Sequence, residues 1–359
     1  MNEIWWWRTS FGKEEICHVS ESISNECLSQ GTVTAEFEQR ISDVLDIPYV
    51  VATTSGSIAL LMSLIATGVG AGDEVIVPNR TWIATAHAPL LLGAKVIFVD
   101  VEEKRPIMDI TKIEEKISKR TKAIIPVHLN GRSVEMEKVK EIAAKYGMTV
   151  IEDAAQAFYS RNKTGFLGSQ SAMGCFSLSV AKLISTGQGG FIVTRDKKTH
   201  ETLKLIRTHG VSDVVNPSWK RIGFNFRFTD ILASIGIEQL KKLPEKIEAV
   251  KEIYQKYIEA MYELPFLKFI PVDIDNGEIP IYIEVLCKER ENLVSFLADK
   301  GVQTRPFYPD LHLAPYFKNS GEFRNSKVFG EQGLFLPCGP AQPLGNVKKV
   351  IKLLRKYRA

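Results

Sequence analysis

The chain of 359 residues is predicted to be an α/β protein, with a mostly parallel central sheet in a large domain and a smaller C-terminal α+β domain. Short apolar runs that suit burial on both faces alternate with helical stretches as far as Phe228, which predicts the parallel sheet. After Phe228 the helices become long and rich in Lys and Glu, which indicates a second unit. We place the boundary after Leu243 and expect domains 1–243 and 244–359.

The expected strands are short runs rich in β-branched residues. They are Tyr49–Thr53, Glu74–Pro78, Lys95–Asp100, Thr121–Val127, Thr149–Asp153, Gly174–Leu178 and Gly190–Thr194. Helical patterns lie between them at Ser57–Ala66, Thr81–Leu92, Ile110–Lys119 and Val134–Tyr146. Asp109 is suited to cap the third of these helices.

The C-terminal part is expected to begin with one long helix, Asp230–Met261, which breaks near Pro244 because proline interrupts helical hydrogen bonding. A strand at Ile279–Leu286 and a helix at Arg290–Lys300 follow. A basic helix over Leu344–Arg358 ends the chain.

Composition excludes several classes of protein. The net charge of +4 comes without a basic block, so we expect no nucleic-acid partner. The five cysteines are scattered and form no Cys-x-x-Cys pair, which indicates a cytoplasmic protein rather than a disulfide scaffold or a zinc site. The stretch from Tyr49 to Gly72 is uncharged and long enough to span a bilayer, but polar residues at 53–57 interrupt it. A strand, a turn and a helix explain it better, and no membrane association is expected.

Lys182 and Asp153 are the most informative residues for chemistry. Lys182 lies between Ala181 and Leu183, where burial would lower its pKa and favour a neutral amine that attacks a carbonyl to form a Schiff base. Asp153 ends an apolar run, and at the carboxyl end of a parallel strand it suits the pyridinium nitrogen of pyridoxal phosphate. A surface lysine and a capping aspartate are the alternative for this pair taken alone.

Other strand ends carry groups that fit the same cofactor. Ser55-Gly56-Ser57 opens a helix whose free N–H groups would receive a phosphate, although this is also an ordinary turn and cap. Trp82 would stack on a flat ring or pack in the core. Gln156 lies one helical turn after Asp153, so both can face one ring, and Ser177 ends the sixth strand.

In this order, the residues resemble the DegT/DnrJ/EryC1/StrS sugar aminotransferases, within the fold type I pyridoxal phosphate enzymes. The resemblance runs from about Phe11 to the end and implies an aspartate-aminotransferase-like fold. Its marks are Thr54-Ser-Gly-Ser57-Ile-Ala-Leu60, Ile151-Glu-Asp-Ala-Ala-Gln156-Ala, Cys175-Phe-Ser-Leu-Ser-Val-Ala-Lys182, Gly223-Phe-Asn-Phe-Arg227-Phe-Thr-Asp-Ile-Leu-Ala-Ser and Gly301-Val-Gln-Thr-Arg305-Pro-Phe-Tyr-Pro-Asp-Leu-His312. The last segment is most similar to the perosamine synthase branch.

The resemblance implies pyridoxal 5'-phosphate as cofactor and a role for each matching residue. Lys182 would form the Schiff base and then shuttle a proton, while Asp153 would keep the ring nitrogen protonated. Gln156 would lie near the ring hydroxyl, and Trp82 would stack on the ring. The phosphate would be bound by Gly56, Ser57 and Ser177.

The resemblance further implies transfer of an amino group from L-glutamate, which leaves as 2-oxoglutarate, to a nucleotide-linked keto-sugar such as a 4-keto-6-deoxyhexose, in surface polysaccharide or secondary-metabolite biosynthesis. The enzyme would be a homodimer in which Asn225 reaches the phosphate in the partner's site. His312 would lie near the sugar, and Arg227 would position substrate charge.

Several features depart from the family pattern. Gln188 stands where the family commonly has Glu, and Asn130 stands where Tyr is frequent. The cluster Trp5-Trp6-Trp7 would either line the substrate side or anchor the N-terminus, and we expect it to anchor the N-terminus.

Four alternatives stay open on the sequence. A dehydratase of the same family has a histidine in place of Lys182, and a regulatory protein on the same fold would not need the catalytic groups. A nicotinamide-dependent oxidoreductase would need a Gly-x-Gly-x-x-Gly fingerprint, which the chain lacks. A keto-cyclitol is an alternative substrate.

Overall fold

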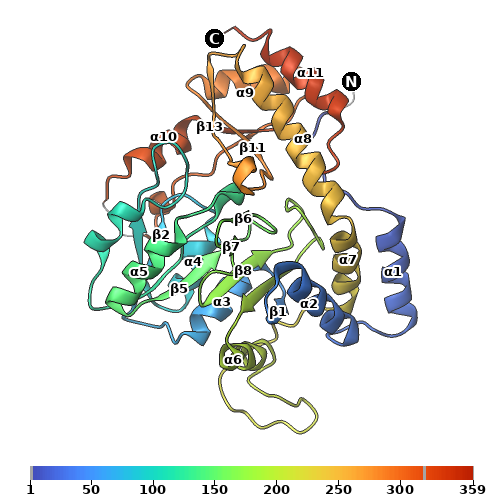
Figure 1. Cartoon of the computed structure of the whole chain (residues 1–359), viewed down its shortest axis with the longest axis vertical. Coiled ribbons are helices and arrows are strands. Elements are labelled where there is room, and N and C mark those ends of the chain that lie inside the picture. The colour runs from blue at the N-terminus through green and yellow to red at the C-terminus, as the bar shows by residue number, and fades with distance from the viewer. Residues whose placement is uncertain (1–2, 318–320, 359) are drawn as a thin grey trace.

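The structure is a computed structural model that describes residues 3–317 and 321–358. Its central layer is a seven-stranded sheet with the order β1-β9-β8-β5-β4-β2-β3 (Figure 1). The strands are β1 (Tyr49–Thr53), β2 (Glu74–Pro78), β3 (Lys95–Val99), β4 (Thr121–Ile124), β5 (Thr149–Asp153), β8 (Met173–Ser177) and β9 (Gly190–Thr194). All run parallel except β9, which is antiparallel to β1 and β8. The predicted α/β class with a mostly parallel sheet is confirmed.

Helices cover both faces of this sheet. Along β1, Val50 and Ala52 enter one apolar cluster while Val51 enters another, as the period of two in a strand requires. On the Val51 face, α3 packs on β8 and β9 and against α4 and α6, and on the other face α2 packs on β1 and against α7. The helices are α1 (Lys13–Ser24), α2 (Thr32–Leu45), α3 (Gly56–Ala66), α4 (Ala84–Leu91), α5 (Met136–Tyr146), α6 (Lys197–Arg207) and α7 (Asp230–Lys241).

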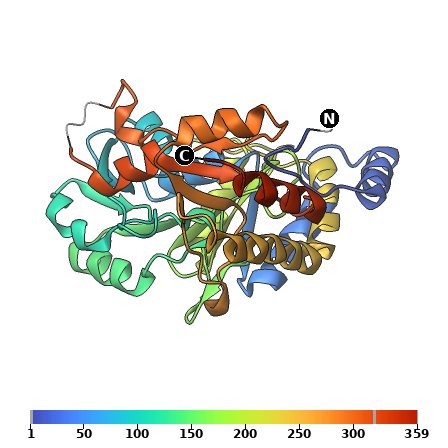
Figure 2. The ribbon, with the colours of Figure 1, turned by 90° about the horizontal axis from the view of Figure 1, so that it is seen from above.

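A smaller antiparallel sheet follows, with the order β10-β11-β13-β12. Its strands are β10 (Leu267–Phe269), β11 (Ile283–Cys287), β12 (Arg305–Pro306) and β13 (Gly333–Leu336), and its helices are α8 (Leu243–Met261), α9 (Arg290–Ala298), α10 (Arg324–Gln332) and α11 (Leu344–Leu354). Figure 2 shows α8 and α11, in gold and red, lying side by side. A two-stranded hairpin of β6 (Arg161–Asn162) and β7 (Gly165–Phe166) stands apart from both sheets.

The N-terminal segment joins this second unit. Ile4 forms a bridge to Val302, and Trp7 forms one to Cys338, both parallel. The α7–α8 junction at Lys242 is the helix break expected near Pro244, and there we propose the division into 1–243 and 244–359. Residues 4–8 of the first proposed domain thus pair with residues of the second, next to β12 and β13.

The prediction of a helix at Ile110–Lys119 is wrong. The segment instead forms two 3₁₀ turns, η1 (Ile110–Lys112) and η2 (Glu114–Lys116), although the Asp109 side chain accepts a hydrogen bond from Thr111 N as a cap. Only Ile113 in this segment is buried, so there is little apolar surface to stabilise a longer helix.

Several other elements differ in extent or were not predicted. The C-terminal strand starts at Ile283 rather than Ile279, and the last helix ends at Leu354 rather than Arg358. The helices α1, α2, α6 and α10 and the strands β10, β12 and β13 were not anticipated. The uncharged stretch from Tyr49 contains β1, a turn and α3, as expected. Within the described residues, no helix combines the length and apolarity needed to cross a membrane.

Candidate active site

Lys182 lies in the loop between β8 and β9, at the end of the sheet where β5 and β8 finish. Burial lowers the pKa of Lys182 to about 8, and the attraction of Asp153 opposes only part of this shift. Among the described residues, no group forms a hydrogen bond or an ion pair with its amine. The lysine is therefore free to react, and burial enlarges the fraction of it that is a neutral amine near neutral pH.

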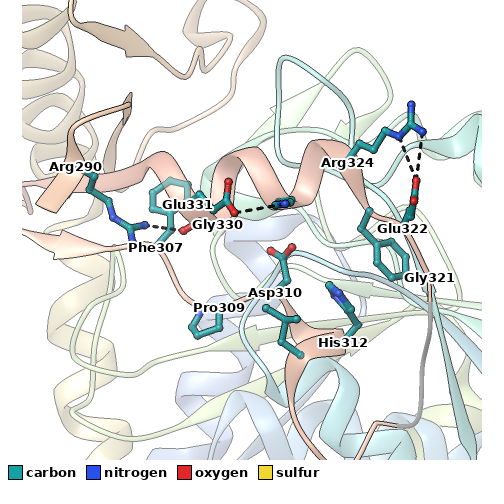
Figure 3. A pocket seen from close by; sticks show the side chains of 13 residues that line it. Arg290, Phe307, Pro309, Asp310, His312, Gly321, Glu322, Arg324, Gly330 and Glu331 are labelled. Atoms are coloured by element: carbon teal, nitrogen blue, oxygen red, sulfur yellow. Dashed lines mark hydrogen bonds and ion pairs between the residues drawn. The ribbon is translucent and has the colours of Figure 1, made fainter.

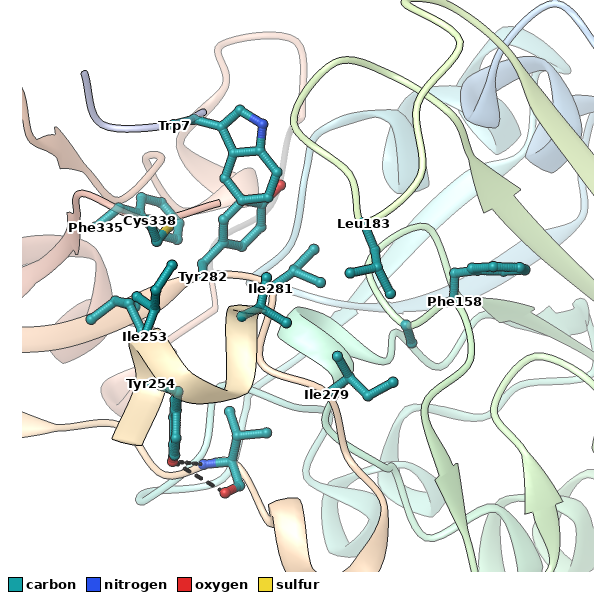
Figure 4. Packing of buried hydrophobic residues seen from close by; sticks show 14 of the residues in the cluster. Trp7, Phe158, Leu183, Ile253, Tyr254, Ile279, Ile281, Tyr282, Phe335 and Cys338 are labelled. Atoms are coloured by element: carbon teal, nitrogen blue, oxygen red, sulfur yellow. Dashed lines mark hydrogen bonds between the residues drawn. The ribbon is translucent and has the colours of Figure 1, made fainter. Parts of the chain in front are cut away.

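Two aromatic side chains hold the loop in front of Lys182. The Trp7 indole N–H donates to the carbonyl of Val180 at 3.0 Å, and the Tyr282 hydroxyl donates to the carbonyl of Ala181 at 2.6 Å. The two rings meet edge to face, 5.4 Å between centroids (Figure 4). The backbone that carries Lys182 is thus fixed by donors from the N-terminal segment and from the residue that precedes β11.

Tyr282 is itself held by Asn130. The Asn130 side chain donates to Tyr282 O at 3.0 Å and accepts from Tyr282 N at 2.7 Å. Asn130 has a φ of 55°, and its N–H donates to the Gln156 side-chain oxygen at 3.0 Å. A continuous set of hydrogen bonds therefore connects Gln156, Asn130 and Tyr282 to the lysine loop.

Asp153 ends β5 with its carboxylate buried. One oxygen accepts from the Thr85 hydroxyl at 2.7 Å and the other from Ala155 N at 3.1 Å. Burial raises the pKa of this carboxyl, and the Thr85 and Ala155 hydrogen bonds offset this only in part. A cation or a charged N–H facing Asp153 would stabilise its ionised form.

The neighbouring Glu152 is buried, and both of its carboxylate oxygens accept hydrogen bonds. His128 lies 2.9 Å from its carboxylate, and the N–H groups of Gly168 and Gln170 donate to it at 2.8 Å each. Burial raises the pKa of Glu152, but these donors outweigh that effect and the net pKa is lowered. Because His128 Nδ1 accepts from Val134 N, the ring proton is on Nε2 and donates to Glu152.

The start of α3 forms another wall. Ser55 caps the helix by accepting from Ile58 N at 3.2 Å, so the N–H groups of Gly56 and Ser57 are left without intrahelical partners. A Cβ on Gly56 would lie 2.8 Å from Ser177 Cβ, so only glycine lets the helix start this close to the end of β8. The N–H groups and the positive end of the helix dipole favour an anion here.

These groups surround a cavity of about 340 Å³. The structure thereby brings together seven of the expected site residues, Gly56, Ser57, Trp82, Asp153, Gln156, Ser177 and Lys182. Trp82 does not pack in the core, because 48% of its surface is exposed and its ring contacts Tyr308 edge to face at 5.0 Å.

Three expected residues lie elsewhere in this chain. His312 lines a separate cavity of about 880 Å³ formed around β12 and α10 (Figure 3), where its backbone N–H and Nδ1 both lie near Asn79 Oδ1, at 3.0 and 3.1 Å. Asn225 and Arg227 lie in the segment between α6 and α7, where Arg227 Nε donates to Asn225 Oδ1 at 3.0 Å. None of the three lines the cavity beside Lys182.

Comparison with known proteins agrees with this arrangement over nearly the whole chain. Residues 9–355 match the sequence model of the DegT/DnrJ/EryC1/StrS aminotransferase family. The chain belongs to this family. Its members are pyridoxal phosphate enzymes, so the chain is a pyridoxal phosphate-dependent aminotransferase.

Several relatives and solved structures are similar to this chain over most of its length. GDP-perosamine synthase of Escherichia coli O157:H7 is 34% identical over 88% of this chain and 89% of its own. The spore coat polysaccharide biosynthesis protein SpsC of Bacillus subtilis is 30% identical over 96% and 94%. Among structures, the aminotransferase TlmJ of Streptoalloteichus hindustanus has a TM-score of 0.95 at 26% identity, covering 99% of this chain and 98% of its own. S. venezuelae DesV in complex with a ketimine intermediate has a TM-score of 0.92 at 28% identity, covering 97% and 95%.

The residues present fit pyridoxal phosphate, the cofactor of the DegT/DnrJ/EryC1/StrS family. The helix start offers N–H donors for a phosphate, and the buried Asp153 offers an acceptor that needs a charged N–H. The Gln156 oxygen is already used by Asn130, while its amide nitrogen donates to no described residue and faces the cavity as a free donor. The uncommitted amine of Lys182 completes the set.

Sequence reasoning missed part of this site. Thr85, Tyr282, Arg305 and Tyr308 line the cavity but were assigned no role. Arg305 and Tyr308 lie in the segment 301–312, and Thr85 lies one helical turn after Trp82, so proximity to recognised residues was the available signal. No such signal pointed to Tyr282, because it lies 101 residues along the chain from Ala181, whose carbonyl accepts its hydrogen bond.

Proposed function

We propose that this enzyme transfers an amino group from L-glutamate to a nucleotide-linked 4-keto-6-deoxyhexose. The observation that carries amino transfer is the free, buried amine of Lys182, since the family's dehydratases have a histidine there. The sugar class is supported by the segment 301–312 and by relatives named GDP-perosamine synthase.

When bound, pyridoxal phosphate supplies an electron-withdrawing ring that lets a proton leave the carbon bearing the amino group. Gly56 and Ser57 would hold its phosphate through backbone N–H groups, together with the Ser177 hydroxyl. Trp82 would cover the ring, and the free amide of Gln156 would donate to the ring oxygen.

Lys182 is the proton carrier in this proposal. Its Nζ takes the proton from the α-carbon of glutamate, and in the second half-reaction it delivers a proton to the sugar carbon that becomes aminated. A pKa near 8 suits both directions, because the amine accepts and releases a proton at comparable cost near neutral pH. The hydrogen bonds from Trp7 and Tyr282 keep Nζ in place between these steps.

Asp153 would accept a hydrogen bond from the protonated ring nitrogen and keep that proton in place. The Thr85 hydroxyl, at 2.7 Å, orients the carboxylate toward the cavity. Since the group is buried, the charge pair is weakly screened by solvent.

We propose a homodimer with shared active sites, in which Asn225 of each subunit reaches the phosphate in the other. The segment between α6 and α7, residues 208–229, extends below α6 in Figure 1. Its most exposed apolar side chains are Val214, Val215, Trp219, Ile222 and Phe224. Such a group of exposed apolar side chains favours burial against another protein surface.

Asn225 and Arg227 lie at the base of this arm, where Asn225 pairs with Thr208 and Arg227 with Thr53, outside the Lys182 cavity of their own chain. Their placement supports a contribution to the partner's site, and Arg227 would then position substrate charge there. We propose that His312 lies near the sugar and that the substrate extends toward the larger cavity in which His312 lies. We also propose a cytoplasmic location, which the five unpaired cysteines support.

The experiment is a screen of nucleotide-linked keto-sugars with L-glutamate as donor, read by mass spectrometry. Gain of an amino group by a 4-keto-6-deoxyhexose, with release of 2-oxoglutarate, is the expected result. Loss of water from the sugar without consumption of glutamate would contradict the proposal in favour of a dehydratase. Amination of a keto-cyclitol alone would contradict the sugar assignment.

A further inference from the structure

The Lys182 cavity contains a second cationic side chain, Arg305 from β12. Among the described residues that line the cavity, Lys182 and Arg305 are the only ones that carry a positive charge. Arg305 has an exposed side chain, and no described acidic residue pairs with it. The cavity therefore includes a cation that the protein itself leaves uncompensated.

Aromatic rings hold the Arg305 guanidinium. Its central carbon lies 5.0 Å from the centre of the Trp6 ring and 5.6 Å from that of Tyr308. Stacking restrains the plane of the guanidinium while its N–H groups at the edge stay free to donate. Backbone pairing of Arg305 with Phe335 in the smaller sheet fixes where the side chain starts.

Two features of the cavity thus attract anions, and they come from different sheets. The N-terminus of α3 lies on the large sheet and fits the cofactor phosphate, as argued above. Arg305 lies on the smaller sheet and is not needed for that phosphate. A second anion, brought by a substrate, is the group it is suited to bind.

We propose that Arg305 binds a carboxylate of the amino donor, a proposal that rests on the proposed function. In an α-amino acid the carboxylate is attached to the carbon that loses its proton, so it must lie in the same cavity as Lys182. In a nucleotide-linked sugar, by contrast, the sugar ring separates the phosphates from the reacting carbon. A cavity of about 340 Å³ is small for a whole sugar nucleotide, and the planar guanidinium matches a carboxylate with two parallel hydrogen bonds.

The test compares Arg305→Gln and Arg305→Lys with a matched control, Arg355→Gln. Arg355 is an exposed arginine just after α11 that pairs with Glu263 and lines neither cavity. Each cofactor-loaded protein is titrated with glutarate, a dicarboxylate without an amino group, and with GDP, by calorimetry. The rate at which glutamate converts the bound cofactor to its amino form is followed separately by absorbance.

Arg305→Gln is expected to weaken glutarate binding about tenfold or more and to raise the glutamate concentration for half-maximal rate by a similar factor. Arg305→Lys is expected to recover part of both, Arg355→Gln to change neither, and GDP affinity to stay the same in all variants. Unchanged glutarate affinity in Arg305→Gln would overturn the proposal. Loss of GDP affinity instead would assign Arg305 to the nucleotide phosphates. If Arg305-dependent glutarate binding holds but no keto-sugar is aminated, only the proposed sugar substrate fails.

Discussion

Residues beside the Lys182 cavity are buried and hydrogen-bonded, whereas the arm at 208–229 exposes apolar side chains to solvent. Beside the cavity, Tyr282 is 3% exposed and the lysine loop is hydrogen-bonded to two other parts of the chain. On the arm, Val215 and Ile222 are 81% and 82% exposed, and Asn225 and Arg227 bond to each other. The residues beside the cavity are thus stabilised by internal contacts, whereas the arm leaves apolar side chains uncovered, and we propose that a second chain covers them.

The largest expected effect comes from substitution of Lys182, in the cavity. Lys182→Ala is expected to lower turnover by more than about 1,000-fold and to abolish the visible absorbance of lysine-bound cofactor. Because the Lys182 amine has no hydrogen-bond partner among the described residues, the thermal midpoint should change little. Lys182→Arg should not restore activity, since a guanidinium stays charged. Turnover near that of the parent in the alanine variant would refute the assignment.

Asp153 and Glu152 are adjacent, but substitution of Asp153 is expected to affect turnover and substitution of Glu152 to affect stability. Asp153→Asn is expected to slow turnover at least about 100-fold while cofactor binding stays measurable, because the ring nitrogen loses its charged partner. Glu152→Gln is the control: its amide nitrogen replaces one of the two oxygens that accept from Gly168 and Gln170, so a donor opposes one of these N–H groups, which should cost about 1–3 kcal/mol of stability. Equal rates in Asp153→Asn and the parent, measured by stopped-flow absorbance, would disprove the role of Asp153.

The lowered pKa of Lys182 predicts how cofactor uptake depends on pH. Below a pKa of about 8 the amine is protonated and does not attack, and above it the neutral amine predominates. Uptake of cofactor by the cofactor-free protein should therefore become about tenfold faster between one pH unit below and one above that value. A midpoint at the ordinary lysine value of 10.5 would show that burial does not act on Lys182.

The smallest expected effects test the donors that hold the lysine loop. Tyr282→Phe removes the hydrogen bond to Ala181, and Tyr257→Phe removes a buried one to Pro337 that lies away from the loop. Both should cost about 1 kcal/mol in denaturant unfolding. Tyr282→Phe alone should also lower turnover about three- to tenfold and shift the pH midpoint of cofactor uptake. If the two variants behave alike, Tyr282 only stabilises the fold.

The sequence predicted those parts of the site whose signal is local. The ends of β5 and β8 and the start of α3 were located, and with them Asp153, Ser177 and Gly56, because burial of both sheet faces leaves a recognisable apolar pattern. Trp7 was expected to anchor the N-terminus. It does so by pairing with Cys338, but its hydrogen bond to Val180 depends on a contact over 173 residues. The prediction of a helix from Ile110 is wrong, because the spacing of apolar residues does not show how much of their surface the rest of the fold covers.

The central claim is that two copies of the chain complete each site, and subunit mixing tests it most directly. Lys182→Ala and Asn225→Asp place their defects in different halves of the proposed site, the second by setting a carboxylate against a phosphate. Each variant must be folded and nearly inactive alone, and subunit exchange must be verified independently. The account predicts that mixed dimers regain partial activity, because one of their two sites then has both halves intact. No recovery despite exchange, or a fully active monomer at assay concentration, would contradict it.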